Sequence, residues 1–255
     1  MTNANNETTD ESKKHYDALI EEVENLIQFI SFDERTPLTV IIGYADYLLS
    51  GQLGSLTEEQ QQAIENMRAS AKRLRHIVDF STDELMLLNY LHGRAKPKLS
   101  RLDIKELIEY TTKKFATTID AKNQQLVIDV SKPRFAKSDR YCCYKIIEYL
   151  IDNAHRYTGM GGQIVIANEL RSNNIMITIS DDGIGISAEE RKHIFDRDFR
   201  GSHELVQQSG GLGRGLYNAK RLANVLGLEI GVESEVGKGS AFWVKLPLAE
   251  ADEEE

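Results

Sequence analysis

Two glycine-rich segments in the second half of the chain carry residues suited to holding a nucleotide. Residues 181–186 read DDGIGI and residues 211–216 read GLGRGL. The carboxylate of Asp181 can accept a hydrogen bond from an exocyclic amine such as that of adenine, and the glycines beside it let the backbone approach a flat base. The glycines of the second segment precede a predicted helix, so their N–H groups can hold phosphate at its positive end. An ordinary turn is the alternative for either segment alone.

Four ordered motifs give these segments their specificity. They are residues 152–158 (DNAHRYT), 181–186, 194–201 (IFDRDFRG) and 211–216, followed by residues 233–240 (ESEVGKGS). In this order and spacing they resemble the N, G1, F and G2 boxes of the GHKL ATP-binding superfamily, which includes gyrase, Hsp90, histidine kinases and MutL. One glycine-rich hexamer would be a weak signal, whereas four motifs in order are a strong one.

The resemblance implies ATP and Mg²⁺ as cofactors. Asn153 would supply an amide oxygen to Mg²⁺, which prefers oxygen ligands. Arg156 faces the same way three residues later and could meet the phosphates, with a plain surface arginine as the equal alternative. The residues implied to contact the cofactor are Asn153, Arg156, Tyr157, Asp181, Gly183, Gly185, Ile186, Arg197, Gly211, Gly213, Arg214, Gly215 and Leu216.

Three positions depart from the family pattern. Tyr149 stands where the family has a second Asn or a Glu, and a neutral phenol is a poor Mg²⁺ ligand and a poor base. Its neighbour Glu148 lies about 100° around the helix, which makes it a doubtful substitute. Arg214 replaces an apolar residue, either to add a cation near the phosphates or to face water, and Asp198 replaces an aromatic residue. We therefore expect weakened Mg-ATP binding.

Residues 31–38 (SFDERTPL) resemble the H box of bacterial sensor histidine kinases, whose pattern is SHELRTPL. Phe32 stands in the place of the phospho-accepting histidine. An imidazole nitrogen has a lone pair that can attack the γ-phosphorus of ATP, whereas a phenyl ring offers only carbon. The residues that match the pattern are Ser31, Arg35, Thr36, Pro37 and Leu38.

Asp33 and Thr36 occupy the H-box positions that the family uses to dephosphorylate a response regulator. On a helix they share one face, with Phe32 on the same side. The Thr36 hydroxyl could orient a water for in-line attack, and Asp33 could polarise that water or orient a partner residue. The equal alternative is that both are solvated residues beside a docking surface made by Phe32.

These features predict a two-component signalling protein that resembles a histidine kinase transmitter, binds ATP and lacks the acceptor, so that it works as a response-regulator phosphatase or a scaffold. The alternative is an active kinase that phosphorylates a partner's histidine in trans or an acceptor of its own outside the motif. The remaining histidines lie outside any acceptor context; they are His15, His76, His92, His155, His193 and His203.

Two elements are expected to position the H box. Apolar residues recur every three or four positions over 16–49 and again to Leu91, with a kink after Pro37 and a Thr57–Gln60 capping box at the start of the second helix. Such a hairpin cannot bury its whole stripe alone, which predicts a homodimeric four-helix bundle.

The second domain is expected to be an α+β sandwich with a mixed, mostly antiparallel sheet and helices on one face. Helices are predicted over 102–116, 141–157, 188–195 and 215–226, and strands over 126–130, 164–167, 175–180, 228–233 and 241–246. The predicted divisions are a disordered start (1–14), the hairpin (15–94), a linker (95–101), the ATP-binding domain (102–248) and an acidic tail (249–255).

Composition limits the class of protein. The net charge of -9 argues against a nucleic-acid partner, and no apolar run approaches the length that spans a bilayer. The first dozen residues also lack the basic and apolar regions of a signal peptide, so we expect a cytoplasmic protein. About thirty residues precede the H box, too few for a sensor module, so we expect the signal to come from a partner or through the bundle. Adjacent Cys142 and Cys143 are predicted to be buried thiols rather than a disulfide or a metal site.

Overall fold

The structure, a computed structural model, describes residues 22, 35–130, 132, 134–208 and 213–249. The chain forms two compact units, residues 1–92 and 93–255. Phe32, Asp33 and Gly211 lie outside the described residues, as does most of the first predicted helix.

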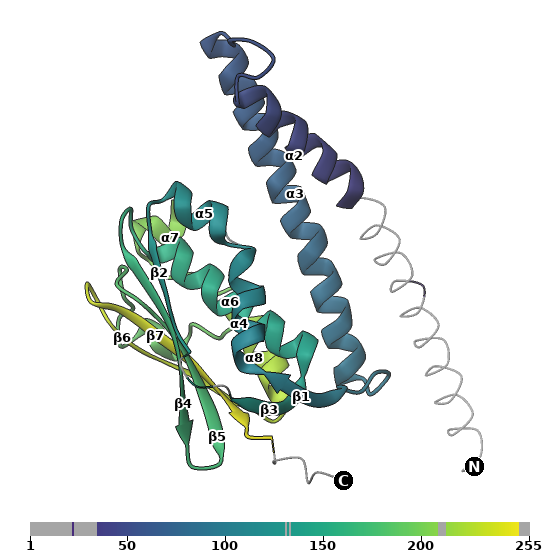
Figure 1. Cartoon of the computed structure of the whole chain (residues 1–255), viewed down its shortest axis with the longest axis vertical. Helices are drawn as coiled ribbons and strands as arrows, with labels where there is room; N and C mark the ends of the chain where they lie inside the picture. The colour runs from purple at the N-terminus through teal and green to yellow at the C-terminus, as the bar shows by residue number, and fades with distance from the viewer. Residues whose placement is uncertain (1–21, 23–34, 131, 133, 209–212, 250–255) are drawn as a thin grey trace, which may run out of the picture. The chain divides into compact units, whose positions relative to one another are not determined.

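The first unit contains a helical hairpin made of α2 (Arg35–Leu49) and α3 (Glu58–Leu91), which lie side by side (Figure 1). At the start of α3, the backbone N–H of Gln60 donates to the Thr57 hydroxyl, and the Gln60 side chain accepts from the Thr57 N–H. This is the predicted capping box, and it satisfies two N–H groups that a helix start leaves open. The kink after Pro37 stays a prediction, because the helix is described only from Arg35.

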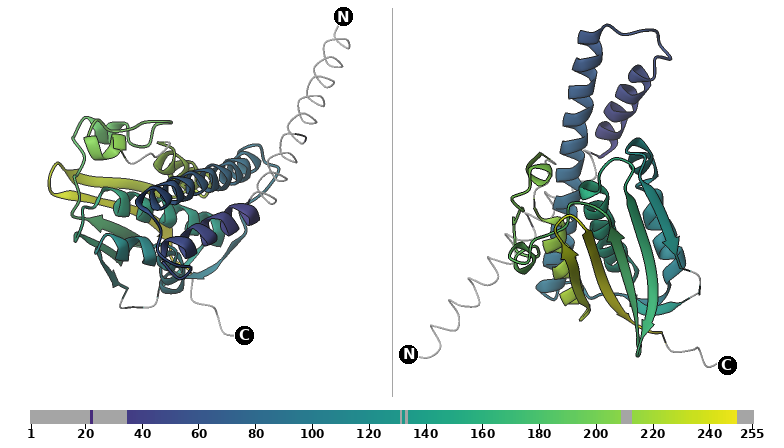
Figure 2. Two further views of the ribbon diagram at one scale, coloured as in Figure 1. Left: turned by 90° about the horizontal axis from the view of Figure 1, so that it is seen from above. Right: turned by 90° about the vertical axis from the view of Figure 1, so that its left-hand side faces the viewer.

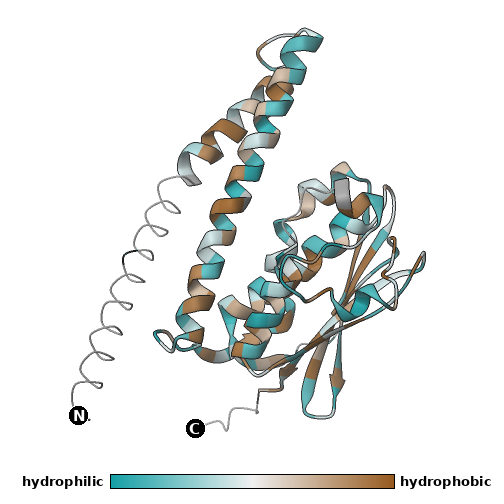
Figure 3. Cartoon of the chain, turned by 180° about the vertical axis from the view of Figure 1, so that it is seen from behind, coloured by the Kyte–Doolittle hydropathy of each residue, from teal (hydrophilic) through white to brown (hydrophobic). Residues whose placement is uncertain are grey.

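The hairpin buries one apolar face and leaves another exposed. Leu38 and Ile42 of α2 pack with Ala71 and Val78 of α3. Figure 3 shows that apolar residues continue around and along both helices. Those that remain largely exposed are Val40, Ile41, Tyr44, Tyr47, Met67, Leu74, Ile77 and Leu91.

The second unit contains seven strands and five α-helices among its described residues, with one 3-10 turn. The strands are β1 (Leu99–Asp103), β2 (Gln125–Asp129), β3 (Phe135–Asp139), β4 (Gln163–Arg171), β5 (Asn174–Asp181), β6 (Glu229–Glu235) and β7 (Gly239–Pro247). The helical elements are α4 (Ile104–Lys113), α5 (Ala116–Ala121), α6 (Arg140–Tyr157), η1 (Glu190–Lys192), α7 (Glu204–Gln208) and α8 (Gly215–Val225).

Several element predictions were wrong. The expected helix over 102–116 is strand β1 followed by two shorter helices, and Leu99 to Arg101, which we assigned to the linker, are part of that strand. Strand β3 and helix α7 were not predicted. The expected helix over 188–195 contains only the short turn η1. The predicted positions of β2, β4, β5, β6, β7, α6 and α8 are confirmed to within a few residues.

The main sheet has the order β2-β4-β5-β7-β6, and β1 pairs with β3 in a separate ribbon. The β2–β4 pair is parallel and the other three pairs are antiparallel, as expected for a mixed, mostly antiparallel sheet. Helices α4, α6 and α8 lie on one face of this sheet (Figures 1 and 2). The predicted two-layer architecture of this unit is therefore confirmed.

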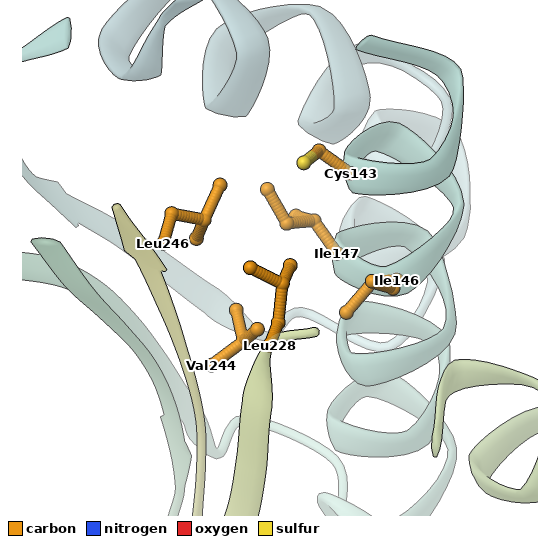
Figure 4. Close-up of a pocket in the computed structure, with 6 residues that line it drawn as sticks. All are labelled: Cys143, Ile146, Ile147, Leu228, Val244 and Leu246. Carbon is orange, nitrogen blue, oxygen red and sulfur yellow. The ribbon is translucent and has the colours of Figure 1, made fainter. Parts of the chain in front are cut away.

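The core of the second unit lies between α6 and the sheet. Inward-facing isoleucines of β4 and β5 are fully buried there. A small gap remains beside α6, and its lining is entirely apolar apart from one thiol (Figure 4): Cys143, Ile146, Ile147, Leu228, Val244 and Leu246. Both cysteines are buried free thiols, as predicted, and Cys143 donates to the Ser138 hydroxyl at 3.1 Å.

Within the described residues, every helix is too short or too polar to cross a bilayer.

Candidate functional site

Asp181 is the last residue of β5, and its carboxylate is buried at the end of the strand. The N–H of Gly183 donates to its Oδ1 at 3.0 Å. Burial raises the pKa of Asp181 from 3.8 to about 6, against the opposing effect of hydrogen bonds from the backbone of Gly183 and Ser240. Above that pH the side chain is a carboxylate, which accepts hydrogen bonds from an amine.

The loop after Asp181 runs tightly against neighbouring backbone. A Cβ on Gly183 would lie 2.3 Å from the carbonyl oxygen of Tyr157, and a Cβ on Gly185 would lie 2.0 Å from that of Glu235. Gly185 also has a φ of 68°, which L side chains rarely adopt. Only glycine fits these two positions, so the two glycines determine the path of the loop at the base of the site.

Residues 233–240, the last motif of the domain, also contact the loop after Asp181. The Ser234 hydroxyl accepts a hydrogen bond from the N–H of Ile186 at 2.8 Å and donates to the carbonyl of Gly239 at 2.7 Å. A Cβ on Gly239 would lie 1.9 Å from the carbonyl oxygen of Asp181. Residues 233–240, noted in the sequence without a specific role, thus hold the loop in place.

The C-terminal half of α6 contributes the residues of the first motif. The side chain of Asn153 is half-buried and makes no hydrogen bond with another described residue, so its amide oxygen is open to a ligand such as Mg²⁺. Arg156 instead forms an ion pair with Asp152, from its Nε to Oδ2 at 2.7 Å. The carbonyl of Tyr157 accepts a hydrogen bond from the N–H of Ile184 at 3.3 Å, which joins α6 to the Asp181 loop.

Two side chains that sequence reasoning missed hold the end of α6. Lys122 donates to the carbonyls of His155, Arg156 and Thr158 at 2.8, 3.1 and 3.3 Å. Gln124 donates to Thr158 at 2.8 Å, and its Oε1 lies 2.7 Å from Nδ1 of His155. Burial, with the Arg156 cation, lowers the pKa of Lys122. A Lys–x–Gln spacing carries no signal for this role without the fold.

Tyr149, the one departure from the family pattern that lies on α6, is explained by packing. The ring of Tyr149 lies against the start of α8, because a Cβ on Gly215 would lie 3.4 Å from its Cδ1. Glu148 is buried in ion pairs with Lys145 and Lys114. Burial alone would raise the pKa of Glu148, but the two lysines reverse this and lower it. The charged Glu148 carboxylate is therefore already paired with two lysines.

The second glycine-rich segment meets the F-box segment through a charged contact. The Nε of Arg214 donates to Oδ1 of Asp198 in a short hydrogen bond, and the Nε of Arg197 lies 3.6 Å from Oδ2 of the same carboxylate. Gly213 has a φ of 69°, and a Cβ there would lie 2.7 Å from the carbonyl oxygen of Phe199. Arg214, which we expected to face either phosphate or water, faces Asp198.

The start of α8 is available to an anion. Arg214 occupies the N-cap position, and among the described residues no side chain caps the helix that begins with Gly215 and Leu216. Uncapped N–H groups at a helix start attract negative charge. The structure thus brings the start of α8 beside Tyr149 of α6, while the Asp181 loop lies at the C-terminal end of α6.

Thr36 is the one H-box candidate whose surroundings the structure shows. It lies in the first turn of α2 with its side chain exposed. In the described part of the chain, no group of three or more His, Cys, Asp or Glu residues could hold a metal ion.

Comparison with known protein families finds matches to both the helical hairpin and the second unit. Residues 22–80 match the His Kinase A (phospho-acceptor) domain model, and residues 138–250 match the model of histidine kinase-, DNA gyrase B- and HSP90-like ATPases. The chain belongs to the two-component histidine kinase family.

Individual relatives are similar along most of this chain. It is 30% identical over 242 residues to the sensor histidine kinase AruS of Pseudomonas aeruginosa, covering 86% of this chain and 22% of that protein. It is 27% identical over 253 residues to the sensor protein SrrB of Staphylococcus aureus, covering 98% of this chain and 40% of that protein. The chain therefore spans well under half the length of these curated relatives.

Solved structures show the same fold. Full-length ShkA in complex with AMPPNP superposes with a TM-score of 0.62 at 24% identity, covering 89% of this chain and 46% of that one. The histidine kinase AdeS of Acinetobacter baumannii gives a TM-score of 0.56 at 23% identity, covering 85% of this chain and 97% of that one.

Proposed function

We propose that this chain is a homodimeric, ATP-binding transmitter protein that does not phosphorylate itself at the H box. The observation that carries the proposal is Phe32, which stands at the acceptor position of a chain whose nucleotide-domain motifs otherwise follow the family order. Its output would be dephosphorylation of a response regulator, or docking of that regulator or of another histidine kinase.

ATP binding is supported by the residues around the site. The buried Asp181 carboxylate offers an acceptor for the adenine amine, and the uncapped start of α8 offers N–H groups for phosphate. ShkA, which has the same fold, was solved in complex with AMPPNP. Arg156 and Tyr157 border this site from α6, the first through its ion pair with Asp152 and the second through its carbonyl.

Mg²⁺ would be held less firmly than in a kinase with two amide ligands. Asn153 offers one open amide oxygen, whereas Tyr149 packs against the start of α8 and Glu148 is paired with lysines. Mg²⁺ usually keeps several waters and takes few protein ligands, so one amide and the phosphates of ATP can suffice. Because Tyr149 does not supply the second ligand, we expect ATP affinity to depend weakly on Mg²⁺.

A phosphatase role is supported by the exposed Thr36 hydroxyl. A receiver domain that docks over this part of α2 could present its aspartyl phosphate to a water held by Thr36, with Asp33 polarising that water. Neither step requires an imidazole in the chain itself.

The central experiment incubates the chain with γ-labelled ATP and Mg²⁺, alone and as the Phe32→His variant. We expect no label on the natural chain and acid-labile label on the variant, because only the variant has a nucleophilic nitrogen at position 32. Acid-labile label on the natural chain would contradict the proposal and point to an acceptor outside the motif. A silent variant that still binds ATP would place the second defect at Tyr149.

The phosphatase role needs its own assay. Receiver domains phosphorylated with acetyl phosphate should lose phosphate faster with the chain than without it. Thr36→Ala should abolish the acceleration, whereas Ser50→Ala, which removes a hydroxyl bonded to the Tyr47 carbonyl at the far end of α2, should leave it unchanged. Co-elution with a receiver or kinase and no effect on its phosphate would instead support the docking role, and label on a partner kinase would support phosphorylation in trans.

A further inference from the structure

Two of the three residues that depart from the family pattern of the ATP-binding domain contact each other. Asp198 and Arg214 both depart from the family pattern, lie 16 positions apart and form an ion pair in the fold. The Asp198 carboxylate also faces Arg197 at 3.6 Å. One carboxylate therefore lies between two guanidinium groups, both of which sequence reasoning assigned to the cofactor.

The backbone segments that carry this pair pack closely together, which brings Asp198 beside Arg214. Asp198 has a φ of 59°, and Gly213, immediately before Arg214, has a φ of 69°. A Cβ on Gly213 would lie 2.7 Å from the Phe199 carbonyl oxygen and 3.0 Å from the carbonyl carbon of Asp198. This close approach of two backbone segments presents the carboxylate to Arg214 at the uncapped start of α8.

We propose that Asp198 is a built-in counter-anion that occupies Arg214 and Arg197 and competes with the phosphates of a bound nucleotide for them. This inference rests on the proposed ATP site and adds a specificity-determining residue to it. A polyphosphate must displace the carboxylate before Arg214 can pair with it, so Asp198 weakens binding more for ligands with more phosphate charge. A ligand without phosphate gains or loses nothing from this competition.

Asp198→Asn isolates the charge. Asparagine has the same shape and accepts a positive φ as readily as aspartate, so the substitution leaves the backbone unstrained. Because exposed ion pairs are weak, removing the competing charge should tighten ATP binding about two- to fivefold, ADP binding less, and adenosine binding not at all. The gain should shrink in about 1 M NaCl, where screening is strong.

The test is isothermal titration calorimetry of the full chain with ATP, ADP and adenosine. Glu229→Gln is the matched control: it also removes one carboxylate from an ion pair of the same unit, with Lys245 on neighbouring strands β6 and β7. It should leave all three affinities unchanged. In an Arg214→Leu background, Asp198→Asn should give a smaller gain, because the main cation that it releases is gone.

The outcomes separate this inference from the proposed ATP site. A natural chain that binds ATP together with an Asp198→Asn variant that binds it no better, or that gains equally for adenosine, would overturn the counter-anion role alone. A chain in which neither protein binds ATP, although both are folded by circular dichroism, would overturn the ATP site and this role with it.

Discussion

Asp181 combines a buried position with a charge, and its effect on stability has a predictable sign. Its pKa in the folded chain is about 6, above the ordinary value of 3.8. Between these values the folded chain holds a proton that the unfolded chain has lost, so the stability contributed by this group falls as the pH rises from about 4 to 6. Above pH 6, the ionised Asp181 side chain lowers the free energy of unfolding by up to about 3 kcal/mol.

Asp181→Asn should therefore stabilise the chain at pH 7.5 and change little at pH 4, as measured by urea unfolding at both values. The variant is expected to keep the hydrogen bond from Gly183 through its amide oxygen while losing ATP affinity. A variant that is equally stable or less stable at pH 7.5 would contradict the burial cost. In the natural chain, ATP affinity should fall below pH 6 as the acceptor becomes protonated.

Gly185 of the Asp181 loop and Gly237 of the turn between β6 and β7 allow the cost of a left-handed backbone to be separated from that of a steric clash. Gly185 and Gly237 have similar φ values of 68° and 76°, but a Cβ on Gly185 would lie 2.0 Å from a carbonyl oxygen, while Gly237 has open space around it. Gly237→Ala should cost about 1 kcal/mol for the left-handed conformation alone. Gly185→Ala should cost several times more and abolish ATP binding. Equal losses of stability, compared by thermal unfolding, would show that the clash relaxes.

The sequence predicts the roles of some single residues better than those of others. The type and spacing of Asp181, Gly183 and Gly185 are sufficient to predict a tight loop at a carboxylate, because the reason is local. The partner of Arg214 is not predictable in this way, since Asp198 is distant in sequence and only the fold brings the two together. Phe32 and Asp33 lie outside the described residues, and their roles remain predictions.

At the scale of elements, α6 depends on the turn between α5 and β2. Lys122 and Gln124 donate hydrogen bonds to carbonyls that the end of α6 leaves unpaired. Gln124→Leu should destabilise the chain by roughly 1–3 kcal/mol, because buried carbonyls lose their donors. Lys122→Met should have a similar effect, whereas Lys105→Met, which removes an exposed ion pair at 3.8 Å, should cost under about 0.5 kcal/mol.

Hydrogen exchange measures this dependence locally. Amide protection should fall around residues 155–159 and in the Asp181 loop in the Gln124→Leu and Lys122→Met chains, because the Tyr157 carbonyl joins the two. Unchanged exchange in that loop, with stability lost, would show that the turn supports only the helix end.

Elements with regular periodicity were predictable, and those set by tertiary contacts were not. The long buried face of α6 and the alternating β5 have clear patterns. Strand β3 is only five residues long, and it pairs with β1 in a separate two-stranded ribbon. The expected helix over 188–195 is replaced by the turn η1, where Glu190 accepts hydrogen bonds from the backbone and hydroxyl of Ser202. Such long-range contacts are not visible as periodicity.

At the scale of the whole molecule, the hairpin leaves several large apolar side chains of α3 exposed. Leu74 and Ile77 of α3 are 46% and 47% exposed, and Met67 is 50% exposed, although the internal core of the hairpin is made by other residues. Exposed apolar side chains in a row along a helix favour a partner surface of the same kind. We expect a second copy of the chain to supply that surface, because homodimers commonly form through a two-fold interface.

The Leu74→Asp/Ile77→Asp double variant should therefore be monomeric by analytical ultracentrifugation at concentrations where the natural chain is a dimer. Each apolar side chain removed from an interface forfeits about 1.5–3 kcal/mol in each copy, which raises the dissociation constant by several orders of magnitude. Val236→Asp, at an exposed apolar residue of the second unit, is the matched control and should remain dimeric. A double variant that sedimented as a dimer would place the interface elsewhere. Because the second unit has its own core, the monomer should still bind ATP, which separates loss of the dimer from loss of the fold.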